Sequence, residues 1–515
     1  QTVSLGPDLR ERLARERFYG YIACTRASEK LIVTFSRHAA DGKILNPSPF
    51  IGHLQQIFPT LEIEQFQDEV ELPDAESAVE IVPLLFQVRN SELKSQNWEE
   101  LLQLPALSEL AENLDELREP DSEENLSPVF AERLFGTTLR TSVSRLEEFA
   151  SCPFRFFVRS GLRAEERKVF ELDARERGSF QHEVLKKFHE RLTAEGKRWR
   201  DLTPAEARAR IHAIAGELME NYRDGLLRDT AQSRFEARAL AESLQDFVEV
   251  VVSWMRGQYQ FDPAAAELDF GGENPSVPAL EIDLDGGHKL ALRGRIDRID
   301  LCRESLRTAT DEALAVVIDY KSSSKKLDKI LVENGVQLQL LAYLNVLRHW
   351  KSPQEVLGVE RLIPAGVFYV SLRGQFESGG SRDEILADAD ESRREAYRHT
   401  GRFDASALDK LDSANAADQF NYSRNKDGSL RKGSAEALPR AEFEKLLDRV
   451  EIQLREMGEK IFSGAAQVDP YRKGRQTPCE YCDYQAACRI DRWTHQYRVL
   501  RAAGKETVSD IPEPS

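Results

Sequence analysis

The stretch Val316–Ser323 reads "VVIDYKSS" and places two charged side chains at the end of a β-branched apolar run. A short continuous run of this kind is typical of a central strand that is buried on both faces. Side chains alternate along a strand, so Asp319 and Lys321 project from the same face. A carboxylate can hold a hard divalent cation, and a nearby ammonium can position a water. This pattern suits metal-assisted phosphodiester hydrolysis, although Asp-x-Lys alone arises often by chance.

Residues on both sides of this stretch extend the pattern. "ALEIDLDG" and "HKLALRGRIDRIDLC" predict a hairpin around Gly286–Gly287, and the second stretch places Asp297 on the strand before Asp319, where it could share a metal ion. "GSFQHEVLKKF" places His182 early in a helix, although a lone helical His is more often packed or solvent-facing. "QLQLLAYL" lies in a predicted helix around 336–349 and puts Gln339 and Tyr343 on one face, where Tyr343 could instead belong to the core.

The remaining elements complete an α/β pattern. We predict a helix up to about Thr25 followed by a strand over Lys30–Phe35, and a helix capped by Ser144. Further predictions are a long amphipathic helical stretch over 205–257, a strand in "AGVFYVSLRG", a polar insertion over 402–436 with a turn at Asn425–Gly428, and a charged amphipathic helix over about 440–462.

The length of the chain and the distribution of its charges limit the number of domains and the partners that it can have. A chain of 515 residues suggests two to four domains, and we find no transmembrane run and no signal peptide. Because residue 1 is Gln, we expect a piece of a longer chain or a processed product. The formal net charge is −17, but residues 61–130 hold nineteen acids against three bases, whereas residues 152–200 hold thirteen bases against eight acids. Local charge decides where a phosphate backbone can lie, so the total does not exclude nucleic acid.

Three of the six cysteines stand in "TPCEYCDYQAAC", Thr477–Cys488. This spacing provides three ligands, Cys479, Cys482 and Cys488, and leaves a fourth to be found. Cys24 and Cys302 lie in apolar contexts, whereas Cys152 is followed by a proline where a helix ends and the backbone can turn a thiolate outward. Four thiolates suit either Zn²⁺ or an iron–sulfur cluster, and a distant Cys with a Cys-x2-Cys-x5-Cys triplet favours [4Fe–4S].

Taken in order, Gly-x-x-x-His, Gly-Arg-Ile-Asp, Asp-Tyr-Lys-Ser and Gln-x-x-x-Tyr resemble the RecB-like branch of the PD-(D/E)XK nuclease superfamily. The resemblance implies a restriction-endonuclease-like core, a central mixed sheet flanked by helices. It implies that His182, Asp297, Asp319 and the backbone carbonyl of Tyr320 ligate Mg²⁺ or Mn²⁺, and that Lys321 orients or activates the attacking water. Asp297, Asp319 and Lys321 would be catalytic, with Gln339 and Tyr343 at the substrate or the active-site wall.

Both "SVSRLEEFASCPFRFF" and the cysteine stretch resemble the AddB family, the B subunits of bacterial AddAB helicase–nucleases. In that family one Cys before the nuclease fold and three after it hold a [4Fe–4S] cluster. The matching residues here are Cys152, Cys479, Cys482 and Cys488. The cluster would close the nuclease domain like a staple, by the loop-closure argument that applies to a disulfide.

"YIACTRASEKLIV" resembles motif VI of superfamily 1 helicases, in which the Arg at the position of Arg26 reaches the γ-phosphate of the nucleotide. No Gly-x4-Gly-Lys-Ser/Thr loop occurs in the sequence, so this chain alone is not a complete motor and would use ATP only within an intact complex. We expect residues 1–60 to end a second RecA-like domain. We expect an acidic linker over 61–140, the iron–sulfur nuclease domain over 141–500 and a tail over 501–515.

These resemblances imply a DNA exonuclease that acts with an AddA-like partner in the bacterial cytoplasm. It would process double-strand breaks, cutting the 5′-terminated strand, without contact to a membrane. Basic residues of 152–200 would guide single-stranded DNA or would form a solvated face; they are Arg155, Arg159, Lys186, Lys187 and Arg191. The alternatives are a free-standing iron–sulfur exonuclease of the CRISPR-associated type and a non-catalytic, zinc-stapled scaffold that binds DNA.

Overall fold

The computed structural model describes residues 9–37, 44–64, 125–165, 173–273, 275–303, 311–374, 389–431, 436–490 and 497–501. The chain divides into two compact units, residues 1–120 and 121–515. The predicted acidic segment 61–130 lies mostly outside the described residues, as does the tail after Arg501. Within the described ranges, no helix is both long enough and apolar enough to cross a membrane.

The first unit contains helix α1, Leu9–Thr25, and helix α2, Pro49–Ile57. The predicted helix up to Thr25 is therefore confirmed. The predicted strand over Lys30–Phe35 is wrong, because these residues are not part of a described strand. Ile32 is 71% exposed. A β-branched run becomes a strand only when a neighbouring strand accepts its backbone hydrogen bonds, and the described part of this unit provides no such neighbour.

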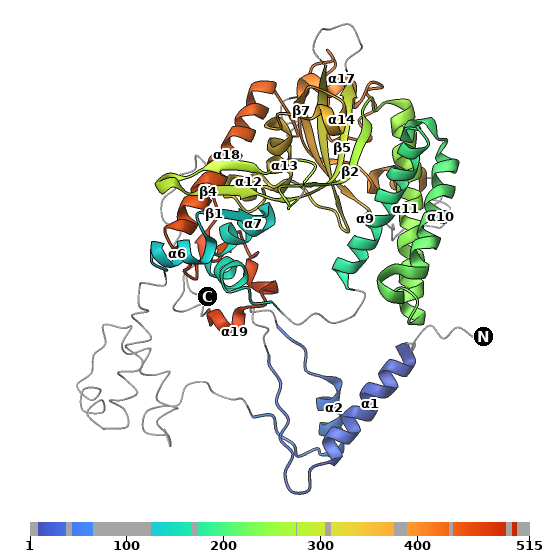
Figure 1. Cartoon of the computed structure of the whole chain (residues 1–515). Coiled ribbons are helices and arrows are strands. Elements are labelled where there is room, and N and C mark those ends of the chain that lie inside the picture. Colours follow the sequence, from blue (N-terminus) through green and yellow to red (C-terminus); the bar gives the residue numbers. More distant parts are fainter. Residues whose placement is uncertain are drawn as a thin grey trace. The chain divides into compact units, whose positions relative to one another are not determined.

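The second unit is built on a six-stranded mixed sheet in the order β2-β5-β6-β7-β8-β9 (Figure 1). Its strands are β2 Asp262–Phe270, β5 Gly294–Arg303, β6 Glu312–Lys321, β7 Arg361–Ser371, β8 Thr400–Asp404 and β9 Ala437–Leu438. Strand β6 pairs antiparallel with β5 and parallel with β7, so "VVIDYKSS" does end a central strand. A second sheet has the order β1-β4-β3, from β1 Thr138–Thr141, β3 Leu280–Asp283 and β4 Lys289–Leu292.

Helices cover both faces of the main sheet, as Figure 1 shows with α9 to α11 on one side and α13 and α18 on the other. The longer helices are α9 Ala174–Ala194, α10 Pro204–Asn221, α11 Ala231–Gly257, α13 Gln339–Arg348, α16 Ala389–Ala396 and α18 Arg440–Phe462. The short ones are α6 Pro128–Phe135, α7 Val143–Ser151, α8 Pro153–Phe156, α12 Lys329–Glu333, α14 Gln354–Leu357, α17 Leu408–Leu411 and α19 Gln485–Cys488.

Two hydrophobic cores lie on opposite faces of the main sheet. Strand β6 contributes Val317 to the core that contains α7, α13 and α18, and contributes Ile318 and Tyr320 to the core that contains α9, α10 and α11. This alternation turns Asp319 and Lys321 away from the Tyr320 side. Burial on both faces explains why the strand is apolar throughout until its last residues.

Several sequence predictions needed correction. The N-cap of α7 is Ser142, whose Oγ accepts a hydrogen bond from the Arg145 N–H, and Ser144 lies inside the helix. The stretch 205–257 is broken at 222–225, where Arg223 and Asp224 adopt positive φ, so that α10 and α11 pack against each other. The stretch "HKLALRGRIDRIDLC" contributes β4 to one sheet and β5 to the other, because the chain changes partner at Arg293.

The stretch 402–436, predicted to be a polar insertion, instead contributes a strand to the main sheet and apolar side chains to the core. Strand β8 pairs with β7, and Phe403, Leu411 and Phe420 are fully buried. Their spacing is irregular, so hydrophobic periodicity gave no sign of them. The predicted turn at Asn425–Gly428 is confirmed by the hydrogen bond from the Gly428 N–H to the Asn425 carbonyl, 3.0 Å.

Candidate active site

Two carboxylates meet where β5 and β6 run side by side. The antiparallel register pairs Arg298 with Ile318, which places Asp297 opposite Asp319. Asp297 Oδ2 accepts a hydrogen bond from the backbone N–H of Tyr320 at 2.7 Å, which fixes this carboxylate against β6. Asp319 forms an ion pair with Lys321, two residues further along the same face. The register therefore brings the two carboxylates onto neighbouring strands, and their sharing of one metal ion stays a prediction.

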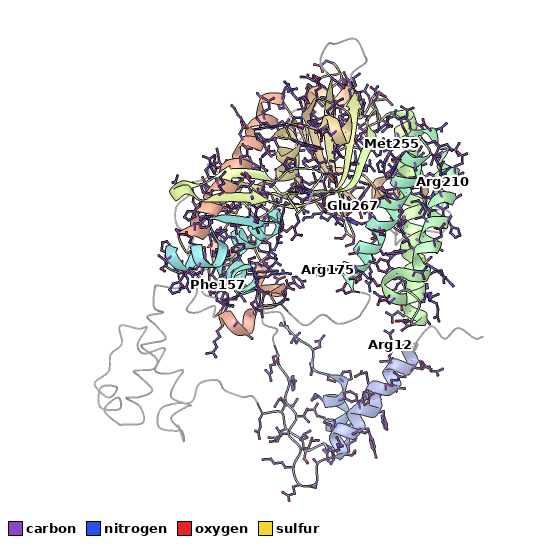
Figure 2. The ribbon with its side chains drawn as sticks, in the orientation of Figure 1. Arg12, Phe157, Arg175, Arg210, Met255 and Glu267 are labelled. Carbon is purple, nitrogen blue, oxygen red and sulfur yellow. The ribbon has the colours of Figure 1, made fainter. Side chains whose placement is uncertain are left out.

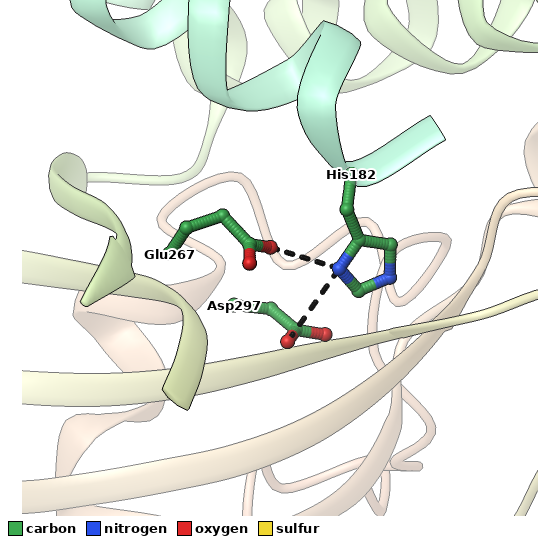
Figure 3. Close-up of side chains that lie close together, drawn as sticks. All are labelled: His182, Glu267 and Asp297. Carbon is green, nitrogen blue, oxygen red and sulfur yellow. Dashed lines mark hydrogen bonds and ion pairs between the residues drawn. The ribbon is translucent and has the colours of Figure 1, made fainter. Parts of the chain in front are cut away.

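His182 reaches the same point from helix α9, as Figure 3 shows. Its Nδ1 lies 2.8 Å from Glu267 Oε1 and 3.6 Å from Asp297 Oδ1. A carboxylate oxygen accepts, so Nδ1 is the donor of this hydrogen bond to Glu267, and a cation bound between these atoms would take the place of that proton. Ligand atoms of His182, Glu267 and Asp297 lie within 4.8 Å of one another, which is close enough to share one cation.

Glu267 did not emerge from the sequence analysis. It lies on β2, whose register with β5 pairs Ala266 with Arg298 and Leu268 with Ile296, so Glu267 faces Asp297. Its φ of +51° is a left-handed conformation, which costs a non-glycine residue about 1–2 kcal/mol. Strain of this kind concentrates at functional sites. Nothing in "PAAAELD" reveals the partner strand, so only the folded sheet could assign Glu267 to this site.

The electrostatics of the three groups favour a bound cation. Burial and the charge of Asp319 raise the pKa of Asp297 to about 7. Burial alone would lower the pKa of His182, but the hydrogen bond with Glu267 and the charge of Asp297 raise it above its ordinary value. The raised pKa of Asp297 and the raised pKa of His182 both reflect the negative charge gathered here, which a divalent ion would neutralise.

Lysines and a tyrosine line the other side of Asp319. The Lys321 Nζ lies 5.6 Å from the centre of the Tyr369 ring, and the Lys325 Nζ lies 4.8 Å from it. Burial and the charge of Lys321 lower the pKa of Lys325. Two ammonium groups therefore stand over one aromatic face next to the carboxylates, where they can meet a phosphate.

Helix α13 brings Gln339 and Tyr343 to this side as predicted. The Gln339 Nε2 donates to the Tyr343 hydroxyl at 3.2 Å, and the Tyr343 side chain also packs in the core. A Cβ at Gly294 would lie 3.3 Å from the Tyr343 hydroxyl and 2.9 Å from Phe270, which explains the glycine in "GRID". Glu147 Oε1 accepts from the N–H groups of Leu338 and Gln339 at 2.6 and 2.7 Å, and so holds the start of α13.

Comparison with known protein families agrees with this geometry. Residues 140–489 match the family model described as the PD-(D/E)XK nuclease superfamily. The chain belongs to the PD-(D/E)XK nuclease superfamily. This match covers β5, β6, α9 and α13, and extends to the last of the clustered cysteines. The expected fold, a mixed sheet flanked by helices, is confirmed.

Similar curated proteins point to one kind of nuclease. The chain is 32% identical over 514 residues to a protein of Symbiobacterium thermophilum named as the B subunit of an ATP-dependent helicase/deoxyribonuclease, and 32% identical over 505 residues to the protein of that name in Moorella thermoacetica. The corresponding protein of Desulforamulus reducens is 30% identical over 513 residues. Each alignment covers 95% of this chain but 43% of the relative, so the chain spans less than half the length of these relatives. The resemblance to AddB proteins is thereby confirmed.

A groove of about 1210 Å³ opens beside the carboxylates of this nuclease domain. It extends from Lys321 and Glu267 to the first turns of α9 and the end of α10, and Figure 2 shows Glu267 at the sheet and Arg175 at the start of α9. Five bases line it, namely Arg175, Lys187, Arg223, Arg295 and Lys321. Four glutamates line it as well, namely Glu183, Glu217, Glu220 and Glu267. Its charge is therefore nearly balanced.

The five basic residues predicted to guide single-stranded DNA do not all line this groove. Lys187 lines this groove, whereas Arg191 is paired with Glu217 and Lys186 approaches Glu190. Arg159 pairs with Glu148 at 2.6 Å, away from the groove. Arg155 does not line the groove either. The structure therefore does not gather the five residues into one path.

The four predicted cysteines approach one another within the nuclease domain. Cys152 ends helix α7 and is buried, while Cys479, Cys482 and Cys488 lie on the partly exposed loop around α19. Burial raises the pKa of Cys479, and the neighbouring Cys152, Cys482 and Cys488 raise it further. Cys302 instead lies within strand β5, and Cys24 in helix α1 of the other unit. A cluster or metal bound by the four would favour their thiolate forms.

Arg26 lies in the first unit, directly after α1, where its backbone N–H donates to the Ile22 carbonyl at 3.1 Å. It is exposed. Its predicted contact with a nucleotide stays a prediction.

Proposed function

We propose that this chain is the nuclease part of the B subunit of an ATP-dependent helicase–nuclease and hydrolyses phosphodiester bonds of DNA with Mg²⁺ or Mn²⁺. The observation that carries the proposal is the meeting of Asp297, Asp319, His182 and Lys321 at one end of the central sheet. The names of the similar proteins support a deoxyribonuclease acting within a larger assembly. In that assembly, an AddA-like partner and ATP would feed single-stranded DNA to this domain in the bacterial cytoplasm.

The donor set fits a hard divalent cation, because oxygens of Glu267 and Asp297 and a ring nitrogen of His182 converge within 4.8 Å. Asp297, Asp319, His182 and the Tyr320 carbonyl would hold the ion. When bound, the ion would neutralise the scissile phosphate and lower the pKa of a water. Lys321 would orient that water, since its ammonium is held beside Asp319. Glu267 would keep the His182 ring directed at the site, or would ligate the ion itself.

Gln339 and Tyr343 would form the wall against which the substrate strand rests. Their mutual hydrogen bond and the capping of α13 by Glu147 restrict both side chains. Side chains that are already held in place lose little conformational entropy when a substrate binds. This wall would therefore position the scissile phosphate with a small loss of entropy.

Cys152, Cys479, Cys482 and Cys488 would hold a [4Fe–4S] cluster that ties helix α7 to the C-terminal loop. The order of the four along the chain, one before the main sheet and three after it, supports the assignment. A cluster would make the purified chain brown with visible absorbance, and a zinc site would leave it colourless. Cleavage of the 5′-terminated strand during double-strand-break processing belongs to the same proposal, with Arg26 as the residue of the motor fragment that would approach nucleotide.

The deciding experiment measures Mn²⁺-dependent loss of linear single-stranded DNA at low salt. The wild-type chain should degrade it, and Asp319→Ala should reduce the rate to the background of the metal-free reaction. Asp283→Ala is the matched control, because Asp283 lies on β3 and its side chain is 86% exposed. Equal rates in wild type and Asp319→Ala would refute the site assignment. The assay should be repeated with the AddA-like partner present.

A further inference from the structure

A second pocket, about 770 Å³ in volume, lies along strand β1 and is separate from the catalytic groove. It is bounded by α6, β1, the start of α7 and the π-helical turn Phe157–Gly161. Five arginines line it, namely Arg140, Arg145, Arg159, Arg163 and Arg293, with Glu165 as the one acidic residue among its lining. This strongly positive character contrasts with the nearly balanced catalytic groove.

Two of the arginines are held by glutamates and shape the pocket. Glu148 lies 3.4 Å from Arg145 and 2.6 Å from Arg159, and Glu165 lies 3.5 Å from Arg145. Among the residues that the structure describes, the guanidinium groups of Arg140, Arg163 and Arg293 form no ion pair or side-chain hydrogen bond. Three guanidinium groups that line one hollow suit an anion, and their planar forks match phosphate oxygens.

The backbone at Arg163 is held in an unfavourable conformation. Its φ of +57° is left-handed, which costs about 1–2 kcal/mol for a residue with a Cβ. Two hydrogen bonds stabilise the loop on either side, since the Ala164 N–H donates to the Val158 carbonyl at 3.1 Å and the Tyr484 hydroxyl donates to the Ala164 carbonyl at 2.7 Å. The fold thus maintains strain at a residue whose side chain lines the pocket, which is a mark of function.

The pocket and the catalytic groove are joined by the start of β5 and the residue before it. Arg293 lines the pocket, Arg295 lines the groove, and Asp297 lies at the candidate metal site. Four residues of extended chain span at most about 14 Å. One strand of B-DNA rises about 3.4 Å per nucleotide, so a phosphate in the pocket would lie within about four nucleotides of the scissile one.

We propose that this arginine pocket, which nothing in the family match assigns, holds a backbone phosphate of the nucleic-acid strand being cut. The inference rests on the proposed nuclease function and extends it. The bases and acids of the catalytic groove nearly balance, so the groove itself has little net charge with which to retain a polyanion. A separate cationic pocket a few nucleotides away supplies that retention and fixes the register of cleavage.

The test is the binding of fluorescein-labelled dT20 to the whole chain in EDTA, measured by anisotropy between 50 and 400 mM salt. In the combined variant Arg140→Gln, Arg163→Gln and Arg293→Gln, the slope of log K against log salt should fall by about 0.7, which corresponds to one lost phosphate contact. The affinity at 0.1 M salt should fall about fivefold by the same relation. Arg361→Gln is the matched control, because Arg361 is 67% exposed and pairs with Glu312 at the opposite end of β6.

Phosphate binding by the pocket is refuted if the combined variant has the melting temperature of wild type and if its affinity for dT20 and its salt slope stay within twofold of the wild-type values. Single variants provide the same readout if the combined variant does not fold, each with an expected loss of up to about fivefold. Failure of the proposed function is seen separately. If wild type binds dT20 through the arginines but never cleaves DNA with Mn²⁺, phosphate binding by the pocket is supported and the nuclease assignment is refuted.

Discussion

The buried ion pair behind the active site provides the sharpest stability prediction. Arg298 and Asp300 lie two residues apart on β5, with side-chain exposures of 1% and 0%. Arg298 Nε and Nη2 donate to the two Asp300 oxygens at 2.7 and 2.6 Å. Arg298 Nη1 also donates to the Tyr320 hydroxyl at 3.1 Å. This network therefore holds Tyr320, which lies between Asp319 and Lys321 on β6.

The perturbation is Asp300→Asn, which keeps the volume of the side chain and removes its charge. The guanidinium of Arg298 would then be buried without a counter-charge, which costs about 3–5 kcal/mol of unfolding free energy. The Tyr259 hydroxyl, 2.8 Å from Asp300 Oδ2, would also lose its charged acceptor. We therefore expect a loss of at least about 3 kcal/mol.

The same strand offers a matched control. Arg295 Nε donates to Asp269 Oδ1 at 2.7 Å, but the two side chains are 53% and 58% exposed. An exposed pair contributes about 0.2–1 kcal/mol and is screened by salt. Asp269→Asn should therefore cost less than about 1 kcal/mol, and 0.5 M NaCl should erase the difference. Both substitutions remove the charge of a carboxylate that pairs with an arginine of β5, and they differ in burial.

The assay is urea denaturation of the metal-free chain followed by tryptophan fluorescence, with the midpoint and slope fitted for each variant. A double variant, Arg298→Met with Asp300→Leu, should recover most of the loss, because apolar residues replace a buried pair at little cost. The reasoning is refuted if Asp300→Asn destabilises no more than Asp269→Asn at an unchanged slope. A double variant as unstable as the single one would also count against it.

Three further outcomes follow. Glu267→Gln should weaken Mn²⁺ binding in calorimetry by about 10–100-fold, because His182 loses its orienting carboxylate; an unchanged dissociation constant, like that expected for Glu281→Gln on β3, would refute the role. Burial lowers the pKa of His399 to about 3, below the unfolded value of 6.5. The unfolded chain therefore binds the extra proton, and stability should fall by about 1.4 kcal/mol per pH unit as pH drops through this window. His399→Gln should flatten that dependence in urea titrations, and an equally steep dependence would contradict it. Cys479→Ser should lose visible absorbance and lower the melting temperature, with nuclease activity lost only as the fold loosens; an unchanged melting curve would show that no clasp exists.

Hydrophobic pattern and turn chemistry predicted the central elements because they are local. "VVIDYKSS", the glycine hairpin and the helix over Arg440–Phe462 appear in the structure where the sequence places them. The same reasoning failed for Lys30–Phe35, since a strand needs a neighbour that the run itself does not specify. It also failed for 402–436, where Phe403 and Phe420 are buried without a regular period.

The sequence alone predicted four residues of the candidate site, Asp319, Lys321, His182 and Asp297. The spacing within "DYK" sets Asp319 and Lys321 on one face by the period of a strand, and the family motifs add His182 and Asp297. Such spacings act within one element, so they are readable without the fold. The same holds for the cysteine triplet and for the glycine of "GRID", whose place next to the Tyr343 hydroxyl is explained by contact.

Only the tertiary structure decided which side chains join that site from elsewhere. Glu267 enters through the register of β2 with β5, Glu147 through the packing of α7 against α13, and the arginine pocket through the meeting of β1, the π-helical turn and Arg293. Strand partner and helix packing are set by the global burial of apolar surface, not by the residues that are thereby brought together. Their chemistry therefore becomes visible only once the chain has folded.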